Sequence, residues 1–327
     1  MSTCLFRSPL AFRLQAFWET NRSVGNKSAH CFKILRRLDE FLLCELKPGE
    51  TITRELAERW FKGMAHLSPG TRINRMGILR RLCLYLSHFD PRTCFVHRAW
   101  QPRRNRPMPY IYSRDEVRRI MAAAETLPDG DGLRRLVFST LVGLLYATGV
   151  RIGEALGMRL GHVDLKRRLI RVQETKFKKS RYVPLAPSVA AQLAHYLRRR
   201  RAAGYSQAAD AHFFVSRSGG YYHPVTFVTT FLAVLRQLGL RGPAPQRGPR
   251  IHDLRHSFAV SRLLAWHRSG ANLYAKLPTL STYLGHVTVT GTELYLHATA
   301  ELLESTGQRF HDRFAVPQGR KHHARHR

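Results

Sequence analysis

The stretch "HDLRHSFA", His252 to Ala259, lies in the C-terminal third of the chain and combines ionisable side chains with an apolar continuation. His252 and Arg255 are three residues apart, so on a helix their side chains project from one face. A histidine three residues before an arginine is usually incidental. Its meaning therefore depends on the residues that the rest of the chain supplies.

The composition indicates a folded protein that binds a polyanion. A length of 327 residues suits two domains, and a hydrophobic content of 44% is ample for packed cores. Lys and Arg outnumber Asp and Glu by 54 to 22, which gives a formal net charge of +32. A distributed excess of this size favours nucleic acid as the partner, although charge alone leaves a ribosomal-type or membrane-adhering basic protein open.

The cysteines predict a reducing compartment. All five (Cys4, Cys31, Cys44, Cys83 and Cys94) fall within the first hundred residues, at no metal-ligand spacing. No apolar run approaches the length that spans a membrane, about 18 residues, and no signal peptide stands out. We therefore expect a soluble cytoplasmic protein with unpaired thiols, no bound metal and no membrane partner.

Residues 1–100 are expected to form a small helical domain with a basic exterior. Segments such as "CFKILRRLDEFLLCEL" place apolar residues at helical spacing, and Ser68 followed by Pro69 is typical of a helix start. Residues 101–109, "QPRRNRPMP", contain three prolines and three arginines, which oppose a helix and keep the segment extended. We interpret them as an interdomain linker.

The second domain, residues 110–316, is expected to be α+β. Ser113 and Glu116 form a capping-box pattern, and a strongly apolar helix ends at Gly149. The segments "HVDL", "RLIRVQ" and "RYVPLA" read as short strands, the last two forming a hairpin with a lysine-rich tip, and "HFFVS" as a further possible strand. The fold class is therefore mainly α with a small antiparallel β-sheet, and residues 317–327 are a basic, histidine-rich tail.

Several reaction classes lack their usual motifs. The chain has no G-x-x-x-x-G-K-[ST], no H-E-x-x-H and no G-x-S-x-G, which counts against nucleotide hydrolysis, zincin and α/β-hydrolase chemistry. Acidic residues are sparse in the second half and form no cluster, so a two-metal nuclease or a DDE-type transposase is disfavoured. No cofactor is expected.

The second domain instead carries a series of basic and imidazole side chains in distinctive contexts. "ATGVRIGEAL" contains Arg151 and Glu154, "TKFKKSRYVPL" contains Lys176, and "LGHVTVTGTELY" contains His286 and, nine residues later, Tyr295. Together with "HDLRHSFA", these segments resemble the tyrosine recombinase (phage integrase) family. That family shows A-T-G-x-R-x-x-E, a hairpin lysine, H-x-x-R-H, L-G-H and a tyrosine about nine residues beyond.

The resemblance covers about residues 110–315 by motif, and residues 1–100 fit the family's core-binding domain more loosely. It implies site-specific DNA cleavage and rejoining through a 3′-phosphotyrosyl intermediate, without metal or ATP, by a homo-tetramer or an assembly with related recombinases on two DNA sites. The family occurs in integration and transposition. The implied catalytic residues are Arg151, Lys176, His252, Arg255, His286 and Tyr295, with Glu154 in support; we also expect Lys178, Lys179 and Arg181 to contact DNA.

The resemblance also implies a role for each catalytic side chain. The two arginines present rigid forks to the phosphate oxygens, Tyr295 attacks the phosphate, and Lys176 protonates the departing 5′-oxygen. His252 assists proton transfer at the tyrosine, and His286 donates a hydrogen bond to a phosphate oxygen. Glu154 supports the cationic site rather than catalysing a step.

Alternatives exist at two of these positions. Lys178 and Lys179 are neighbours of Lys176, which is favoured because it has the family's five-residue offset to the arginine before "VPL". Among other tyrosines, Tyr274 and Tyr283 lack the family's spacing after L-G-H, and Tyr182 is expected to be a packing residue on a strand.

Two departures from the family concern the region before Tyr295. Arg255 and His286 are 31 residues apart, several more than in compact members, and the surplus is expected to lengthen a helix–helix connection at Pro278. Gly291 occupies a position often held by a polar residue. A type IB topoisomerase and a catalytically idle DNA-binding relative stay open as alternative functions.

Overall fold

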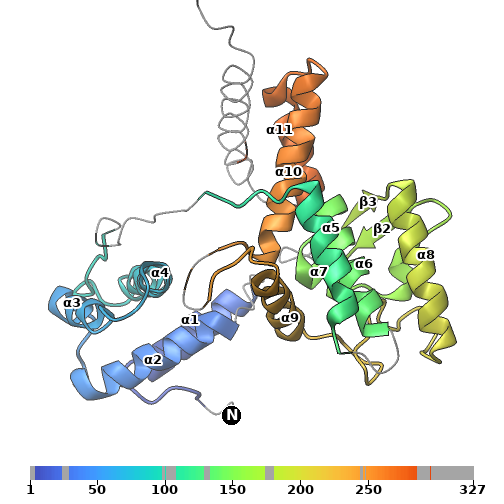
Figure 1. Ribbon diagram of the computed structural model, residues 1–327. Coiled ribbons are helices and arrows are strands. Elements are labelled where there is room, and N and C mark those ends of the chain that lie inside the picture. The colour runs from blue at the N-terminus through green and yellow to red at the C-terminus, as the bar shows by residue number, and fades with distance from the viewer. Residues whose placement is uncertain are drawn as a thin grey trace, which may run out of the picture. The chain divides into compact units, whose positions relative to one another are not determined.

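The chain forms two compact units, Met1–Pro107 and Met108–Arg327 (Figure 1). In this computed structural model the described residues are 4–23, 29–97, 100, 108–128, 133–173, 180–243, 246, 248–285 and 295. No helix within them combines the length and the apolarity that a membrane-spanning segment requires.

The first unit is helical throughout its regular structure. Its helices are α1 (Ala11–Ser23), α2 (Ala29–Glu45), α3 (Arg54–Lys62) and α4 (Pro69–Leu86). Ser68 accepts a hydrogen bond from the backbone of Thr71, with Pro69 as the first helical residue, so the expected start of α4 is confirmed. Leucines from α1, α2 and α4 are fully buried and join these helices in one core.

The second unit is built around the apolar helix α6 (Leu133–Thr148), against which α5 (Arg114–Ala122), α8 (Pro187–Ala202) and α10 (Ile251–Arg268) pack. The remaining helices are α7 (Ile152–Leu156), α9 (Pro224–Gln237), α11 (Leu273–Leu284) and the 3₁₀ turns η2 (Ala123–Thr126) and η3 (Leu160–His162). The capping box at Ser113 and Glu116 is present with both of its hydrogen bonds.

A three-stranded antiparallel sheet accompanies these helices, in the order β1 (Val163–Asp164), β2 (Leu169–Val172) and β3 (Arg181–Pro184). Ile170 pairs with Val183, and both face the core. The expected fold class, mainly α with a small antiparallel sheet, is confirmed. The segment "HFFVS" makes only isolated bridges, although Phe213 and Phe214 are fully buried.

The expectation that Tyr182 packs inside the protein was wrong. Successive side chains of a strand point to opposite faces, so the burial of Val183 directs its neighbour outward. The Tyr182 side chain is accordingly 64% exposed.

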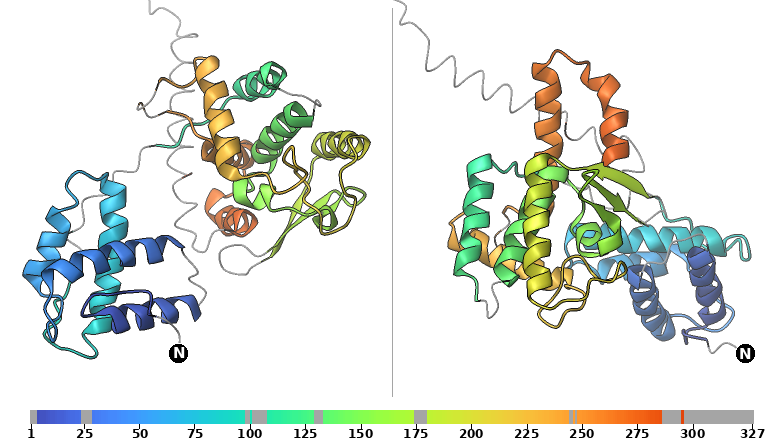
Figure 2. Two further views of the ribbon diagram at one scale, coloured as in Figure 1. Left: turned by 90° about the horizontal axis from the view of Figure 1, so that it is seen from below. Right: turned by 90° about the vertical axis from the view of Figure 1, so that its right-hand side faces the viewer.

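Helices α10 and α11 form an antiparallel pair beside the sheet (Figure 2). The expected connection at Pro278 was wrong, because Pro278 lies inside α11, and the turn between the helices falls at residues 269–272. Proline removes the hydrogen bond to the carbonyl four residues earlier, here that of Tyr274. Tyr274 is 78% exposed and lies in the first turn of α11.

Gly149 ends α6 and turns the chain towards α7. Its φ is +63°, a left-handed conformation that glycine adopts without strain. A Cβ added at this position would lie 2.6 Å from Cδ1 of Phe258 and 3.2 Å from Cδ2 of Leu284. The glycine of the A-T-G motif is therefore required both by its backbone conformation and by its close contact with α10 and α11.

We predict that Gly149→Ala lowers the free energy of unfolding by about 2–4 kcal/mol, because it adds a steric overlap to the left-handed strain. Gly270→Ala is the matched control: its φ is +74°, and nothing lies within 4 Å of the added Cβ. It should cost only about 1–2 kcal/mol. Urea denaturation of both variants measures the difference, and equal losses would contradict the packing argument.

Candidate active site

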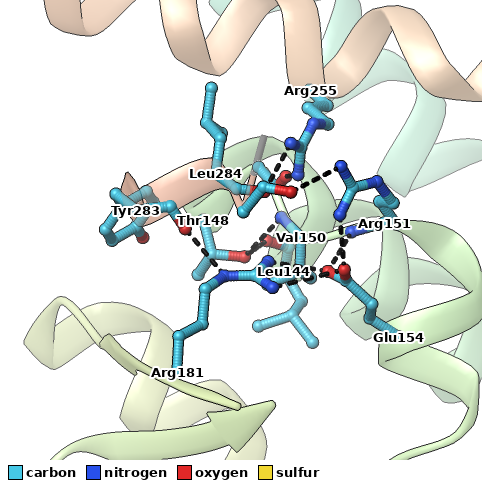
Figure 3. A network of polar contacts seen from close by, with 11 residues as sticks. Leu144, Thr148, Val150, Arg151, Glu154, Arg181, Arg255, Tyr283 and Leu284 are labelled. Atoms are coloured by element: carbon cyan, nitrogen blue, oxygen red, sulfur yellow. Dashed lines mark hydrogen bonds and ion pairs between the residues drawn. The ribbon is translucent and has the colours of Figure 1, made fainter. Parts of the chain in front are cut away.

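Arg255 joins three segments of the second unit. It lies in the second turn of α10, whose start is stabilised by a 2.7 Å hydrogen bond from the backbone N–H of Arg250 to the Asp253 carboxylate. The Arg255 side chain is buried, and its two terminal nitrogens donate to the carbonyl oxygens of Gly149 and Leu284, each at 2.6 Å. These carbonyls end α6 and α11, where cations are favoured by the helix dipole (Figure 3).

Burial lowers the pKa of Arg255 and encloses one of its N–H donors. Removal from water, followed by the nearby charge of Arg151, lowers the pKa of Arg255 to about 10, so the guanidinium stays charged at neutral pH. Its Nε–H is buried and makes no hydrogen bond to the described residues. A buried donor without an acceptor is costly, and an incoming oxyanion would satisfy it.

Arg151 and Glu154 lie at the two ends of the first turn of α7. The Glu154 carboxylate accepts hydrogen bonds from the backbone N–H of Arg151 at 3.0 Å and from its guanidinium at 2.7 Å. The second terminal nitrogen of Arg151 donates to the carbonyl of Gly285 at 3.0 Å (Figure 3). The Arg151 side chain is 37% exposed, so this guanidinium is held in place yet open to a ligand.

Arg181 begins β3 and points into the same cluster. Its terminal nitrogens donate to the Glu154 carboxylate at 2.7 and 3.3 Å, and its Nε donates to the carbonyl of Tyr283 at 2.7 Å. The side chain is only 12% exposed. We expected Arg181 to contact DNA, but the guanidinium is engaged inside the protein, so in this structure it instead anchors the hairpin strand to α7 and α11.

The glycine of the L-G-H motif makes room for this cluster. Gly285 ends α11 in the left-handed conformation, with a φ of +66°. A Cβ at this position would lie 2.9 Å from one terminal nitrogen of Arg181. Gly285 thus lets the arginine reach Glu154 while its own carbonyl accepts the hydrogen bond from Arg151.

Tyr295 lies against α10 and contacts a histidine that the sequence interpretation did not select. The Tyr295 side chain is 1% exposed and packs with Val260, among others. Its hydroxyl is 3.0 Å from Nδ1 of His256, and the two rings are 5.3 Å apart. The available signal was the second histidine of H-x-x-R-H, which lies one helical turn after His252.

His252, the expected proton-transfer residue, lies on the outer side of His256. The side chain is exposed, and its ring meets the His256 ring edge to face at 4.8 Å. The surrounding protein lowers the pKa of His252 by partial removal from water, and the positive charge of Arg255 adds to that effect. Neutral imidazole is therefore favoured at this position.

Burial and the neighbouring arginines act in opposite directions on the pKa of the Tyr295 hydroxyl. Burial raises its pKa, while the positive charges of Arg255 and Arg151 act in the opposite direction. At neutral pH the hydroxyl therefore keeps its proton until a base removes it.

Four expected site residues lie outside the described part of the chain: Lys176, Lys178, Lys179 and His286. The same holds for Gly291. The three lysines belong to the connection between β2 and β3, which are paired from Val172 and Arg181 onward. No group of three or more potential metal ligands occurs among the described residues.

The other candidate tyrosines have different surroundings. Tyr182 and Tyr274 are exposed and lie on β3 and α11, and Tyr283 stacks on Phe258 with ring centroids 5.4 Å apart. Burial raises the pKa of Tyr283 to about 12.

Comparison with known proteins identifies the family. Residues 111–301, more than half of the chain, match the phage integrase family. The chain belongs to this family. Among its integrase relatives, y4rB of Sinorhizobium fredii, which is named as an integrase/recombinase, is 36% identical over 305 residues, covering 92% of this chain and 96% of the relative. The tyrosine recombinase XerC of Mycobacterium tuberculosis is 33% identical over 213 residues, 65% of this chain and 66% of XerC.

Solved structures of integrases share the fold. The Tn1549 transposon integrase in complex with transposon right end DNA aligns with a TM-score of 0.65 at 17% identity, covering 93% of this chain and 99% of that one. The XerH recombinase in a post-cleavage complex with its difH substrate aligns with a TM-score of 0.62 at 19% identity. The alignment covers 84% of this chain and 77% of XerH. A lambda integrase dimer bound to a core site aligns with a TM-score of 0.63 at 17% identity. The alignment covers 88% of this chain and 76% of the lambda integrase chain.

The Glu154 carboxylate gives a prediction for this integrase site. Burial raises its pKa, but hydrogen bonds from Arg181 and Arg151 outweigh burial, and the pKa is lowered overall. A lowered folded-state pKa contributes stability above the unfolded-state value of about 4.3, and this contribution is lost as the pH falls through the folded-state value. Glu154→Gln should therefore be least stable relative to the parent at neutral pH.

Urea denaturation of both proteins between pH 7 and pH 3 measures this difference. The gap in unfolding free energy should begin to narrow below about pH 4.3, where the carboxylate of the unfolded parent takes up a proton. It should go on narrowing until the folded-state carboxylate is protonated as well. A gap that stays constant over the whole range would contradict an ionised Glu154 in the folded protein.

Proposed function

We propose that this phage integrase family member is a site-specific DNA recombinase that cleaves and rejoins strands through a 3′-phosphotyrosyl intermediate, without metal or ATP. The observation that carries the proposal is the position of the Tyr295 hydroxyl, beside His256 and within the field of Arg255 and Arg151. A tyrosine hydroxyl, an imidazole and two guanidiniums thus lie close together, which supports the proposal.

Arg151 and Arg255 supply the phosphate-binding groups. Transfer of a phosphodiester builds negative charge on the non-bridging oxygens, and guanidiniums match those oxygens with paired N–H donors. Both arginines are fixed by backbone carbonyls and, for Arg151, by Glu154, so they need little reorganisation when the phosphate arrives. Fixed donors of this kind are each worth on the order of 3–4 kcal/mol in the transition state.

The cleavage step conserves bonds. The Tyr295 hydroxyl gives its proton to a neighbouring histidine as its oxygen attacks the scissile phosphorus. The bond from phosphorus to the 5′-oxygen breaks, and a 3′-phosphotyrosine and a free 5′-hydroxyl result. Lys176 donates a proton to the departing 5′-oxygen, and His286 donates a hydrogen bond to a non-bridging oxygen. Rejoining is the reverse reaction with a new 5′-hydroxyl, so the phosphotyrosine conserves the bond energy.

Both units are proposed to hold DNA. Residues 1–100 would act as a core-binding domain, residues 110–316 as the catalytic domain, and the net charge of +32 would make binding strongly dependent on salt. Lys178 and Lys179 would contact the backbone near the scissile phosphate. Strand exchange between two sites in the cytoplasm requires several active sites, which favours a homo-tetramer or an assembly with related recombinases.

Covalent trapping tests the nucleophile. DNA duplexes that bind the protein are first selected from a randomised pool. Each selected duplex is then prepared with a nick next to a candidate cleavage position. Cleavage there releases a short 5′-hydroxyl strand that diffuses away, so the covalent protein–DNA adduct accumulates. The parent should form this adduct in the presence of EDTA, and Tyr295→Phe should form none. Denaturing gels with labelled DNA measure both.

The matched control for this test is Tyr283→Phe, which removes a hydroxyl from α11 and should retain adduct formation. An adduct that persists in Tyr295→Phe would remove Tyr295 as the nucleophile. Site-independent relaxation of a supercoiled plasmid by a monomer would favour a type IB topoisomerase. The absence of any adduct would favour a catalytically idle DNA-binding relative.

The role of Lys176 is tested with a leaving group that needs no proton. We predict that Lys176→Ala slows cleavage of an ordinary substrate by about 10²–10⁴-fold, the usual contribution of a general acid. A substrate with sulfur in place of the bridging 5′-oxygen should restore the rate, because a thiolate leaves readily without protonation. Lys178→Ala and Lys179→Ala are the controls, and sulfur rescue of one of these instead would reassign the acid.

A further inference from the structure

The side chains of Tyr295, His256 and Asp253 lie next to one another in that order, with His256 in the middle. Nδ1 of His256 is 3.0 Å from the Tyr295 hydroxyl, within the range for proton transfer between hydrogen-bonded groups. On the opposite side of the ring, Nε2 of His256 lies 3.9 Å from Oδ1 of Asp253. The side chains of His256 and Asp253 are 13% and 2% exposed, so water contributes little at either end.

We propose that His256 is the proton acceptor for Tyr295 in this recombinase and that Asp253 orients its ring. This inference rests on the proposed function and assigns to His256 the task that the family resemblance gave to His252. His252 contacts the His256 ring and lies on the exposed side of the helix.

The hydrogen bonds around Asp253 favour the required tautomer. The carboxylate accepts hydrogen bonds from the backbone N–H of Arg250 at 2.7 Å and from its guanidinium at 3.2 Å, which fix it at the start of α10. An ionised carboxylate favours a proton on the nearer ring nitrogen, Nε2. Nδ1 then carries a lone pair directed at the Tyr295 hydroxyl.

Other ionisable groups nearby do not compete for the proton. Arg255 and Arg151 act on the Tyr295 hydroxyl as cations and favour its ionised form. Tyr112, which precedes α5, lies near Asp253, and burial raises its pKa above the usual range. His252 is held towards its neutral form by its surroundings.

The proposed step is balanced. As the Tyr295 oxygen bonds to phosphorus, its proton passes to Nδ1 of His256, and the imidazolium formed is stabilised by the Asp253 carboxylate. The 5′-oxygen leaves with a proton from the general acid. In rejoining, His256 returns its proton to the Tyr295 oxygen as that oxygen is displaced.

His256→Asn tests the proposal, because the asparagine oxygen can accept a hydrogen bond near the Nδ1 position but takes no proton in this pH range. In single-turnover cleavage of the nicked trapping duplex, the parent rate should rise with pH as the imidazole that accepts the proton becomes neutral. His256→Asn should lower the rate at pH 7 by about 10²–10³-fold and remove this rise. The deficit should shrink at strongly alkaline pH, as the Tyr295 hydroxyl begins to ionise without a base.

His252→Asn is the matched control, an identical substitution one turn away on the same helix. It should retain the rise in cleavage rate with pH. Asp253→Asn should lower the cleavage rate less than His256→Asn does. Added imidazole should partly restore cleavage by His256→Gly but not by Tyr295→Phe. Thermal denaturation of each variant identifies any that fail to fold. If His256→Asn fails to fold, the rescue of His256→Gly by imidazole decides the role of His256.

The outcomes separate this inference from the function itself. Loss of the pH-dependent rise in His252→Asn, with its retention in His256→Asn, would overturn the assignment in favour of His252. A slow His256→Asn enzyme with an unchanged pH profile would mean that His256 only positions the tyrosine. If the parent itself forms no adduct, the proposed function fails instead.

Discussion

Two helix C-termini meet in the second unit, and hydrogen bonds from arginines hold them together. Arg255 donates to the last carbonyls of α6 and α11 at once, and Arg151 and Arg181 donate to carbonyls at the end of α11. Helix C-termini present unpaired carbonyl oxygens and a partial negative charge, which stabilise cations there. The same contacts that close the fold therefore fix two guanidiniums side by side, at the place where we propose that the phosphate binds.

One carboxylate serves two of these arginines. Glu154 is 9% exposed and is bonded by both Arg151 and Arg181, so part of the cluster's positive charge is left for a ligand. This imbalance favours an anion over a neutral ligand, and it does so with groups that are already fixed. Such preorganisation is the main way in which protein dipoles and charges stabilise a phosphoryl transition state. Arg181 of strand β3 is bonded to the same carboxylate, so the strand and the Arg151 guanidinium share one anchor.

Local sequence signals were accurate wherever short-range chemistry decides the structure. The capping box at Ser113 and the start of α4 at Ser68 were predicted from side chains that bond the adjacent backbone. Pro278 and Tyr182 were misjudged, because the position of a proline in a helix and the outward face of a strand depend on what is packed elsewhere. Arg181 was expected at the DNA surface, since nothing in "KSRYVPL" reveals that Glu154, 27 residues earlier, binds its guanidinium.

The sequence by itself determined the family, the fold class and the set of candidate catalytic residues. Each family motif is a short stretch that is recognised from its residue types and their order along the chain, without a structure. Tertiary structure alone decided which side chains meet. His256 and Tyr295 are 39 residues apart, and Arg255 reaches carbonyls 106 residues before and 29 residues after it. Contacts at such separations depend on how α6, α10 and α11 pack, and that packing is set by the whole apolar core rather than by any one motif.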